Sequence, residues 1–128
     1  MEIRIAAAAI MRSDGATLLV RKRGTSAFMQ PGGKIDGGES ALDALRRELS
    51  EELGLIIQPE QADYIGRFSA PAANEPDCTV SAELFRLDVN EEFRVLAEIE
   101  EARWVTRTTY KDIPLAPLTE YEILPVIW

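Results

Sequence analysis

Short runs of mostly apolar residues, separated by clusters of turn-forming residues, recur along most of the chain. Runs of this length and pattern are typical of β-strands. We predict strands at residues 3–11, 17–23, 64–69, 79–89 and 102–106, and a shorter extended segment at residues 28–33. The first two strands flank a turn that contains Asp14 and Gly15, so they are predicted to form a hairpin.

One segment has apolar residues at helical spacing instead. Leucines recur three or four residues apart and would form a single apolar face: Leu42, Leu45, Leu49 and Leu53. Ser40 is suited to cap the start of this helix, because Asp43 three residues later completes a capping pattern. Gly54 is suited to end it in the left-handed conformation. A second, shorter helix is predicted at residues 118–127.

This order of elements predicts an α+β or mixed α/β fold, in which helices pack against a sheet. The chain has 128 residues and no repeat or linker-like segment, so we predict a single domain over residues 1–128. No run approaches the ~18 apolar residues of a membrane span. The apolar N-terminus carries Glu2 and Arg4 and is interpreted as a strand, not as a signal peptide.

Composition narrows the chemistry that the chain can perform. Histidine is absent, which excludes imidazole metal ligands and every histidine-based catalytic triad. The single cysteine, Cys78, excludes an internal disulfide and fits a reducing cytoplasm. The net charge of −8 argues against general binding to nucleic-acid backbones. A small anionic substrate remains compatible with this charge if a metal ion supplies the positive charge.

The helix predicted after Ser40 carries an unusual group of carboxylates, namely Glu48, Glu51 and Glu52. Like charges at this spacing cost about 0.2–0.5 kcal/mol per pair. On a helical wheel the three lie within an arc of ~100° beside the leucine stripe, at the border of the core. Such an arrangement suits a hard divalent cation. The alternative is a solvated charged face that Arg46 and Arg47 partly neutralise.

Residues 33–55 resemble the Nudix box, G-x5-E-x7-R-E-U-x-E-E-x-G-U, where U is a bulky aliphatic residue. Every position of the box is filled in this sequence, by Gly33, Glu39, Arg47, Glu48, Leu49, Glu51, Glu52, Gly54 and Leu55. The resemblance implies a Nudix-type α/β/α sandwich with a mixed sheet, a catalytic loop-helix-loop and a C-terminal helix.

The resemblance also implies an activity and a metal. Nudix hydrolases use Mg²⁺ or Mn²⁺ to cleave a nucleoside diphosphate linked to another group X, by attack of water on phosphorus. Carried over, Glu48 and Glu52 would be the primary metal ligands, and the carbonyl of Gly32 would complete the shell. Glu51 would be a third ligand or a bridge to metal-bound water, and Arg47 would orient the glutamates. Glu39 would brace the loop. The alternative is a non-catalytic Nudix module that binds a nucleotide as a sensor or regulator.

Three residues outside the box, together with Lys34 at an unspecified position within it, complete the expected site. Glu98 would be an accessory ligand or the general base, although a solvated loop charge is an equal alternative for it. Glu48 is the other candidate for the base. Arg23 and Lys34 would contact substrate phosphates, although Arg23 could instead be a charge that protects an edge strand. Phe28 would stack on a base or else be buried in the core.

The expected partner is a small-molecule nucleotide, with no nucleic acid or membrane, and the expected state is a monomer or homodimer. One departure from the family bears on the substrate. The branch that acts on oxidised guanine nucleotides usually has a Pro-Pro-Ala-Asn segment, and this chain has Pro117 at the place of the asparagine. Because proline cannot hydrogen-bond a purine edge, this argues against an oxidised guanine substrate.

Overall fold

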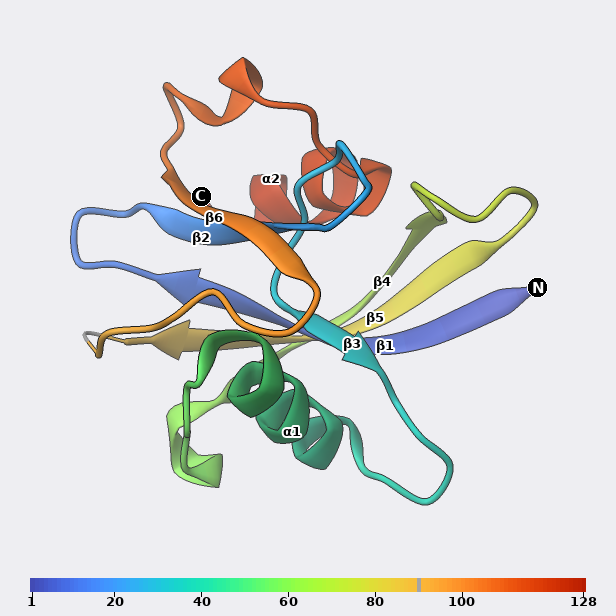
Figure 1. The fold of residues 1–128 in the computed structure, drawn as a ribbon, viewed down its shortest axis with the longest axis horizontal. Helices are drawn as coiled ribbons and strands as arrows, with labels where there is room; N and C mark the ends of the chain where they lie inside the picture. The colour runs from blue at the N-terminus through green and yellow to red at the C-terminus, as the bar shows by residue number, and fades with distance from the viewer. Residues whose placement is uncertain (90) are drawn as a thin grey trace.

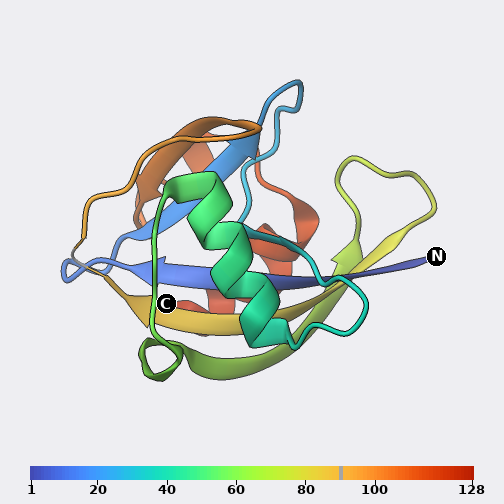
Figure 2. The same cartoon turned by 60° about the horizontal axis from the view of Figure 1, so that its bottom comes forward.

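In residues 1–89 and 91–128, which the computed structural model describes, a mixed sheet of six strands has helices on both faces (Figures 1 and 2). The strands are β1 (Glu2–Met11), β2 (Thr17–Lys22), β3 (Gly32–Lys34), β4 (Asp63–Pro71), β5 (Thr79–Asp88) and β6 (Ile99–Val105). Helix α1 (Ala41–Leu53) covers one face, and a C-terminal helical segment, η3 (Leu118–Ile123) with α2 (Leu124–Ile127), covers the other. Single turns of 3-10 helix occur at η1 (Pro59–Gln61) and η2 (Tyr110–Asp112). The predicted sandwich is confirmed.

Strand β1 lies at the centre of the sheet. The strand order is β4-β5-β1-β2-β6, and β1 pairs in parallel with β5 along its whole length. On its other edge, β1 pairs with β2 at Met11↔Thr17 and with β3 from Ile5↔Lys34 to Ala7↔Gly32. The predicted hairpin is therefore present, and its two strands diverge so that β3 adds to the beginning of β1.

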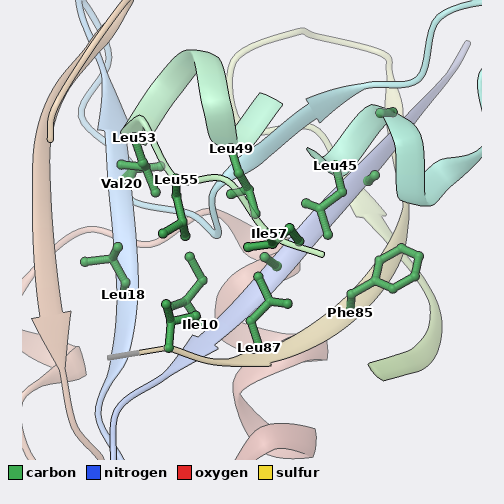
Figure 3. Close-up of a cluster of buried hydrophobic side chains, with 14 of the residues drawn as sticks. Ile10, Leu18, Val20, Leu45, Leu49, Leu53, Leu55, Ile57, Phe85 and Leu87 are labelled. Atoms are coloured by element: carbon green, nitrogen blue, oxygen red, sulfur yellow. The ribbon is translucent and has the colours of Figure 1, made fainter. Parts of the chain in front are cut away.

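The apolar run in β1 is continuous because both of its faces are buried. Ala6, Ala8 and Ile10 belong to the cluster of side chains under α1, to which the leucines of the helix also belong (Figure 3). Ala7 and Ala9 point to the opposite face and belong to the cluster under the C-terminal helical segment. The small alanine side chains leave room for both helical layers to pack closely on this strand.

Both predicted ends of α1 are confirmed. The Ser40 hydroxyl oxygen accepts a hydrogen bond from the backbone N–H of Asp43 at 3.1 Å. Gly54 has a φ of 63°, and its N–H donates to the carbonyl of Ser50 at 3.1 Å. The C-terminal helix occupies the predicted residues 118–127, but η3 is a π-helix. Among the described residues, no helix is long and apolar enough to cross a bilayer.

Two segments differ from the prediction. Strand β6 begins at Ile99, three residues before the predicted start at residue 102, and it pairs with β2. Residues 28–33 do not form one extended strand. Phe28 and Met29 make isolated bridges to Leu115 and Val20, and β3 begins only at Gly32. The partners of β6 and of Phe28 are distant in sequence, and local pattern does not specify them.

Leu49 of α1 is fully buried in the cluster between the helix and the sheet. We expect Leu49→Ala to lower the free energy of unfolding by about 3 kcal/mol, through lost burial and the cavity that it leaves. Ile56→Ala is the matched control, because Ile56 is 73% exposed, and its effect should stay within about 0.5 kcal/mol. Chemical denaturation measures both, and equal losses would contradict this assignment of the core.

Candidate active site

The carboxylate of Glu52 is the most unusual polar group in the described structure. Its side chain is 2% exposed, although it projects from α1 among apolar residues. One oxygen, Oε1, accepts a hydrogen bond from the backbone N–H of Gly32 at 3.1 Å. The other, Oε2, has no hydrogen-bond partner in residues 1–89 and 91–128. Burial raises the pKa of Glu52 to about 7, and the nearby negative charges of Glu48 and Glu98 add to the increase.

Arg47 organises the residues around Glu48. Its guanidinium donates two hydrogen bonds to Glu39, both at 2.9 Å, and one to Glu48 at 2.9 Å. It also donates to the backbone carbonyl of Lys34 at 3.1 Å. Glu39 in turn accepts from the backbone N–H of Asp36 at 3.0 Å, and together with Arg47 this lowers the pKa of Glu39 to about 2. The loop before α1 is thereby tied to the helix, as predicted for a bracing glutamate.

Two adjacent glycines of β3 bring the backbone close to these carboxylates. A Cβ atom at Gly33 would lie 2.6 and 2.7 Å from the two carboxylate oxygens of Glu48, which is too close for any side chain. A Cβ atom at Gly32 would overlap the carbonyl oxygen of Ala6 on β1, and Gly32 has a φ of +144°. Gly33 thus leaves space for Glu48, whereas Gly32 permits the pairing of β3 with β1.

The helical wheel predicted that the three helix carboxylates lie together at the border of the core. In the structure they do not. Glu52 is inside the core, the Glu48 side chain is 16% exposed, and the Glu51 side chain is 55% exposed. Glu51 instead lies 3.7 Å from Arg47 as a surface ion pair. The wheel gives only angles around the helix, and the depth of each position follows from how closely the sheet and neighbouring loops approach.

The donor set nevertheless fits a hard divalent cation. Within residues 1–89 and 91–128, no three Asp, Glu or Cys side chains are already grouped closely enough to hold a metal ion. The unpaired Oε2 of Glu52 is a buried carboxylate oxygen that needs a partner, and a cation would supply one. Glu48 and Glu98 act on Glu52 electrostatically, so their charge also favours a cation here.

A cleft of about 360 Å³ opens beside these glycines. Its walls include the side chains of Ile5 on β1, Val80 on β5 and Leu118 on η3, and residues 71–75 close one side. Gly32 and Gly33 also line it. A mostly apolar cavity of this size that ends at polar groups is typical of a small-molecule site.

The cleft brings together three of the residues that were predicted to complete the site. Arg23, Lys34 and Glu98 all line it. The Glu98 side chain is 62% exposed and lies 3.3 Å from the ammonium of Lys22. The guanidinium of Arg23 donates to the carbonyl of Ala97 at 3.3 Å and lies 3.5 Å from the carboxylate of Glu100 in an exposed ion pair. The rim of the cleft therefore carries the basic side chains of Arg23 and Lys34 as well as the carboxylate of Glu98.

Phe28 has a different role from the predicted contact with a base. It is 3% exposed and packs with Leu19 and Val105, so its ring faces have no room for a ligand. The guanidinium carbons of Arg21 and Arg103 lie 5.9 and 5.8 Å from the ring centre. The alternative of core burial is therefore the one that the structure supports.

Sequence reasoning missed three cleft residues, namely Lys22, Gln30 and Thr119. Regular alternation along a strand would place Lys22 and Arg23 on opposite faces, but β2 ends at Lys22 and its register against β6 shifts between Arg21 and Lys22. That irregularity has no signal in the sequence. Gln30 and Thr119 lie far apart along the chain, and only the fold brings them into contact.

Comparisons with known proteins agree with this architecture. A family model described as NUDIX domain matches residues 1–126. An ADP-ribose pyrophosphatase of Methanocaldococcus jannaschii is 33% identical over 88 residues, which cover 66% of this chain and 50% of that protein. An 8-oxo-dGTP diphosphatase of Haemophilus influenzae is 40% identical over 58 residues, which cover 42% of this chain and 43% of that protein. The matches thus span about half the length of these curated relatives.

Solved structures have the same fold. A MutT NUDIX hydrolase from Burkholderia pseudomallei superposes with a TM-score of 0.72 and 26% identity, covering 94% of this chain and 92% of that one. A MutT protein from Methanosarcina mazei has a TM-score of 0.69 and 27% identity, covering 82% of this chain and 77% of that one.

The buried Glu52 makes the stability of the metal-free protein depend on pH. Its pKa is about 7 in the folded state and 4.5 as a free side chain, so between these values the folded protein binds more protons than the unfolded one. Stability should therefore fall as pH rises from about 4.5 to about 7, by up to about 3 kcal/mol. Urea denaturation in chelator, in steps across this range, measures the fall.

Glu52→Gln should remove this fall, because the amide does not titrate, and should stabilise the metal-free protein near pH 8. Glu51→Gln on the same helix is the matched control, since Glu51 is exposed, and it should keep the wild-type profile. An unchanged profile in Glu52→Gln would show that another group titrates.

Proposed function

The chain belongs to the NUDIX domain family, and we propose that it is a metal-dependent hydrolase of a nucleoside diphosphate linked to another group. The reaction is attack of water on a phosphorus of the diphosphate. The main support is the buried carboxylate of Glu52, which has an unpaired oxygen and lies against Gly32 at the edge of a cleft with a basic rim. The curated relatives named above, which act on nucleotides according to their names, agree with this reaction class.

We assign the metal to Glu48, Glu51, Glu52 and the carbonyl oxygen of Gly32. When bound, Mg²⁺ or Mn²⁺ offsets the charge of the diphosphate and lowers the pKa of the attacking water. The oxygen-only ligand set favours these hard ions over softer ones.

The residues of the chain hold the Glu48 carboxylate in position before substrate binds. Arg47 fixes the Glu48 carboxylate through a 2.9 Å hydrogen bond while it is itself held by Glu39. Gly33 leaves the space in which that carboxylate lies. Preorganised charges of this kind cost no rearrangement when the reaction begins.

Basic side chains at the rim of the cleft bind the phosphates. Lys22, Arg23 and Lys34 line the cleft next to the two glycines. They supply a local positive field on a chain whose net charge is −8. We assign Arg23 and Lys34 to the phosphate groups, and Lys22 to the placement of Glu98, with which it forms an ion pair.

Glu98 is our assignment for the general base. Its carboxylate lines the cleft and is 62% exposed, so it is accessible to a water molecule beside a bound diphosphate. Glu48 is the second candidate, although its 2.9 Å bond to Arg47 occupies one of its oxygens.

We further propose that residues 1–128 act as a single domain in the cytoplasm, as a monomer or homodimer, on a small-molecule nucleotide. The net charge of −8 disfavours nucleic-acid backbones as partners. The two named activities of the relatives concern different nucleotides, so the group X and the base need direct measurement.

A panel of nucleotides tests the proposal. Nucleoside triphosphates, ADP-ribose, other nucleotide sugars, dinucleoside polyphosphates and 8-oxo-dGTP are incubated with Mg²⁺, with and without excess chelator, and the products are identified. We expect hydrolysis of a diphosphate linkage that chelator abolishes. Glu52→Gln should lower turnover by at least about 10²-fold, because it removes a charged metal ligand. Glu60→Gln, at an exposed glutamate outside the cleft, is the control and should retain activity.

Binding measurements separate the catalytic proposal from its alternative. A protein that binds a nucleotide in calorimetry but hydrolyses none would be a sensor or regulator. Turnover close to wild type in Glu52→Gln would contradict the metal assignment. Equal affinity for a non-hydrolysable analogue with Mg²⁺ and with chelator would show that basic side chains such as Arg23 bind the phosphates without metal.

Gly33 gives a second test, because its missing side chain makes room for Glu48. Gly33→Ala should displace that carboxylate and lower turnover by about 10²-fold, as expected when a catalytic group is misplaced by about 1 Å. The melting temperature should change much less. Gly37→Ala in the same loop is the control, since a Cβ there meets nothing within 4 Å. A large melting shift in Gly33→Ala with unchanged turnover per folded molecule would indicate a purely structural glycine.

A further inference from the structure

Gln30 carries a buried amide that the proposed reaction does not use. The residue is 6% exposed, and it lines the cleft two positions before Gly32. Its Oε1 accepts a hydrogen bond from the hydroxyl of Thr119 at 2.8 Å. Its Nε2 has no partner in residues 1–89 and 91–128. Buried amide donors are normally hydrogen-bonded in native proteins, so this N–H group lacks a partner that a ligand can provide.

The contact with Thr119 determines which end of the amide is free. Thr119 is fully buried, and its hydroxyl donates to the carbonyl oxygen of Gln30. In the opposite orientation of the amide, this hydroxyl would accept from Nε2 and would need another acceptor for its own proton. Thr119 therefore holds the side chain of Gln30 with its oxygen engaged, and the buried NH₂ group is left without an acceptor in the described residues.

The surroundings of this donor suit a flat heterocyclic ring. Ile5, Val80 and Leu118 contribute apolar walls to the same cleft, and about 360 Å³ is enough to hold a base with its sugar. Gly32 and the basic rim lie on the same cleft, and only Pro31 separates Gln30 from Gly32 in the chain. A nucleotide with its phosphates at the glycines thus has its base near the amide.

We propose that Gln30 is the residue that selects the base, by donating a hydrogen bond from Nε2 to an exocyclic carbonyl oxygen, with Thr119 as the positioning residue. This inference rests on the proposed function, since it concerns the base of the same nucleotide. The hydrogen bond from Nε2 favours a base with an exocyclic carbonyl oxygen over a base that has an amino group at the same ring position. An amino group facing Nε2 would place two donors together and leave both without an acceptor.

Matched nucleotides isolate this interaction. Inosine and adenosine nucleotides differ in a carbonyl versus an amino group at one ring position, and so do uridine and cytidine nucleotides. Each pair is presented with the same linked group, chosen as the one that wild type hydrolyses best, and kcat/KM is measured for all four. We expect wild type to prefer the carbonyl member of at least one pair by about 10- to 100-fold, the range of one well-placed hydrogen bond in a buried site.

Three variants assign the preference to Gln30 and its partner. Gln30→Leu should reduce the ratio of kcat/KM values to near 1, chiefly through KM for the preferred base. Gln30→Glu should reverse the preference, because a carboxylate accepts from an amino group and repels a carbonyl. Thr119→Val keeps the shape of the residue but releases the amide, so it should weaken the preference while kcat is retained. Gln58→Leu, at an exposed amide outside the cleft, is the control and should leave the ratio unchanged.

The outcomes separate this inference from the proposed function. Hydrolysis by wild type with equal kcat/KM for both members of each pair would overturn the role of Gln30 and leave the hydrolase proposal intact. The same holds if wild type has a preference that Gln30→Glu and Thr119→Val both leave unchanged. A wild-type protein that neither binds nor hydrolyses any nucleotide would overturn the proposed function, and the base selection with it. Melting temperatures of all variants verify that each is folded.

Discussion

The hydrogen bond from the Gly32 N–H to the buried carboxylate of Glu52 joins the helix to the sheet at the edge of the cleft. It requires α1 to lie close to β1 and β3, and the small residues in those strands make this approach possible. Ala6 and Ala8 of β1 belong to the cluster under the helix, and Gly32 has no side chain to clash with β1. The close packing of the helix on the sheet thus buries the carboxylate of Glu52, which costs free energy. One of its oxygens, Oε2, is left without a partner in the described residues.

The charge of this region is balanced locally. Arg47 binds Glu39 and Glu48 through 2.9 Å hydrogen bonds and lies 3.7 Å from Glu51. The guanidinium of Arg47 thereby offsets the repulsion between the carboxylates on this face of the helix. Glu52 is left out of this network, so it is the carboxylate whose charge depends most on a ligand.

The cleft combines two recognition surfaces that come from different parts of the chain. In the proposed function, the glycines and the basic rim, with Arg23 and Lys34, would bind a diphosphate. Gln30 and Thr119, which contact each other across the fold, offer one oriented donor beside apolar walls. Affinity for phosphates and selection of the base therefore have separate physical origins, and a variant can alter one without the other.

The sequence by itself determined the features that depend on neighbouring residues. The caps of α1 at Ser40 and Gly54, the hairpin, the apolar faces and the complete box from residue 33 to residue 55 all follow from local backbone preferences and spacing. The tertiary structure alone decided how deeply each polar group is buried. Glu52 is inside the core while Glu51 is exposed, and Gln30 meets Thr119, because depth and contact depend on the distance between layers, which many long-range contacts set together.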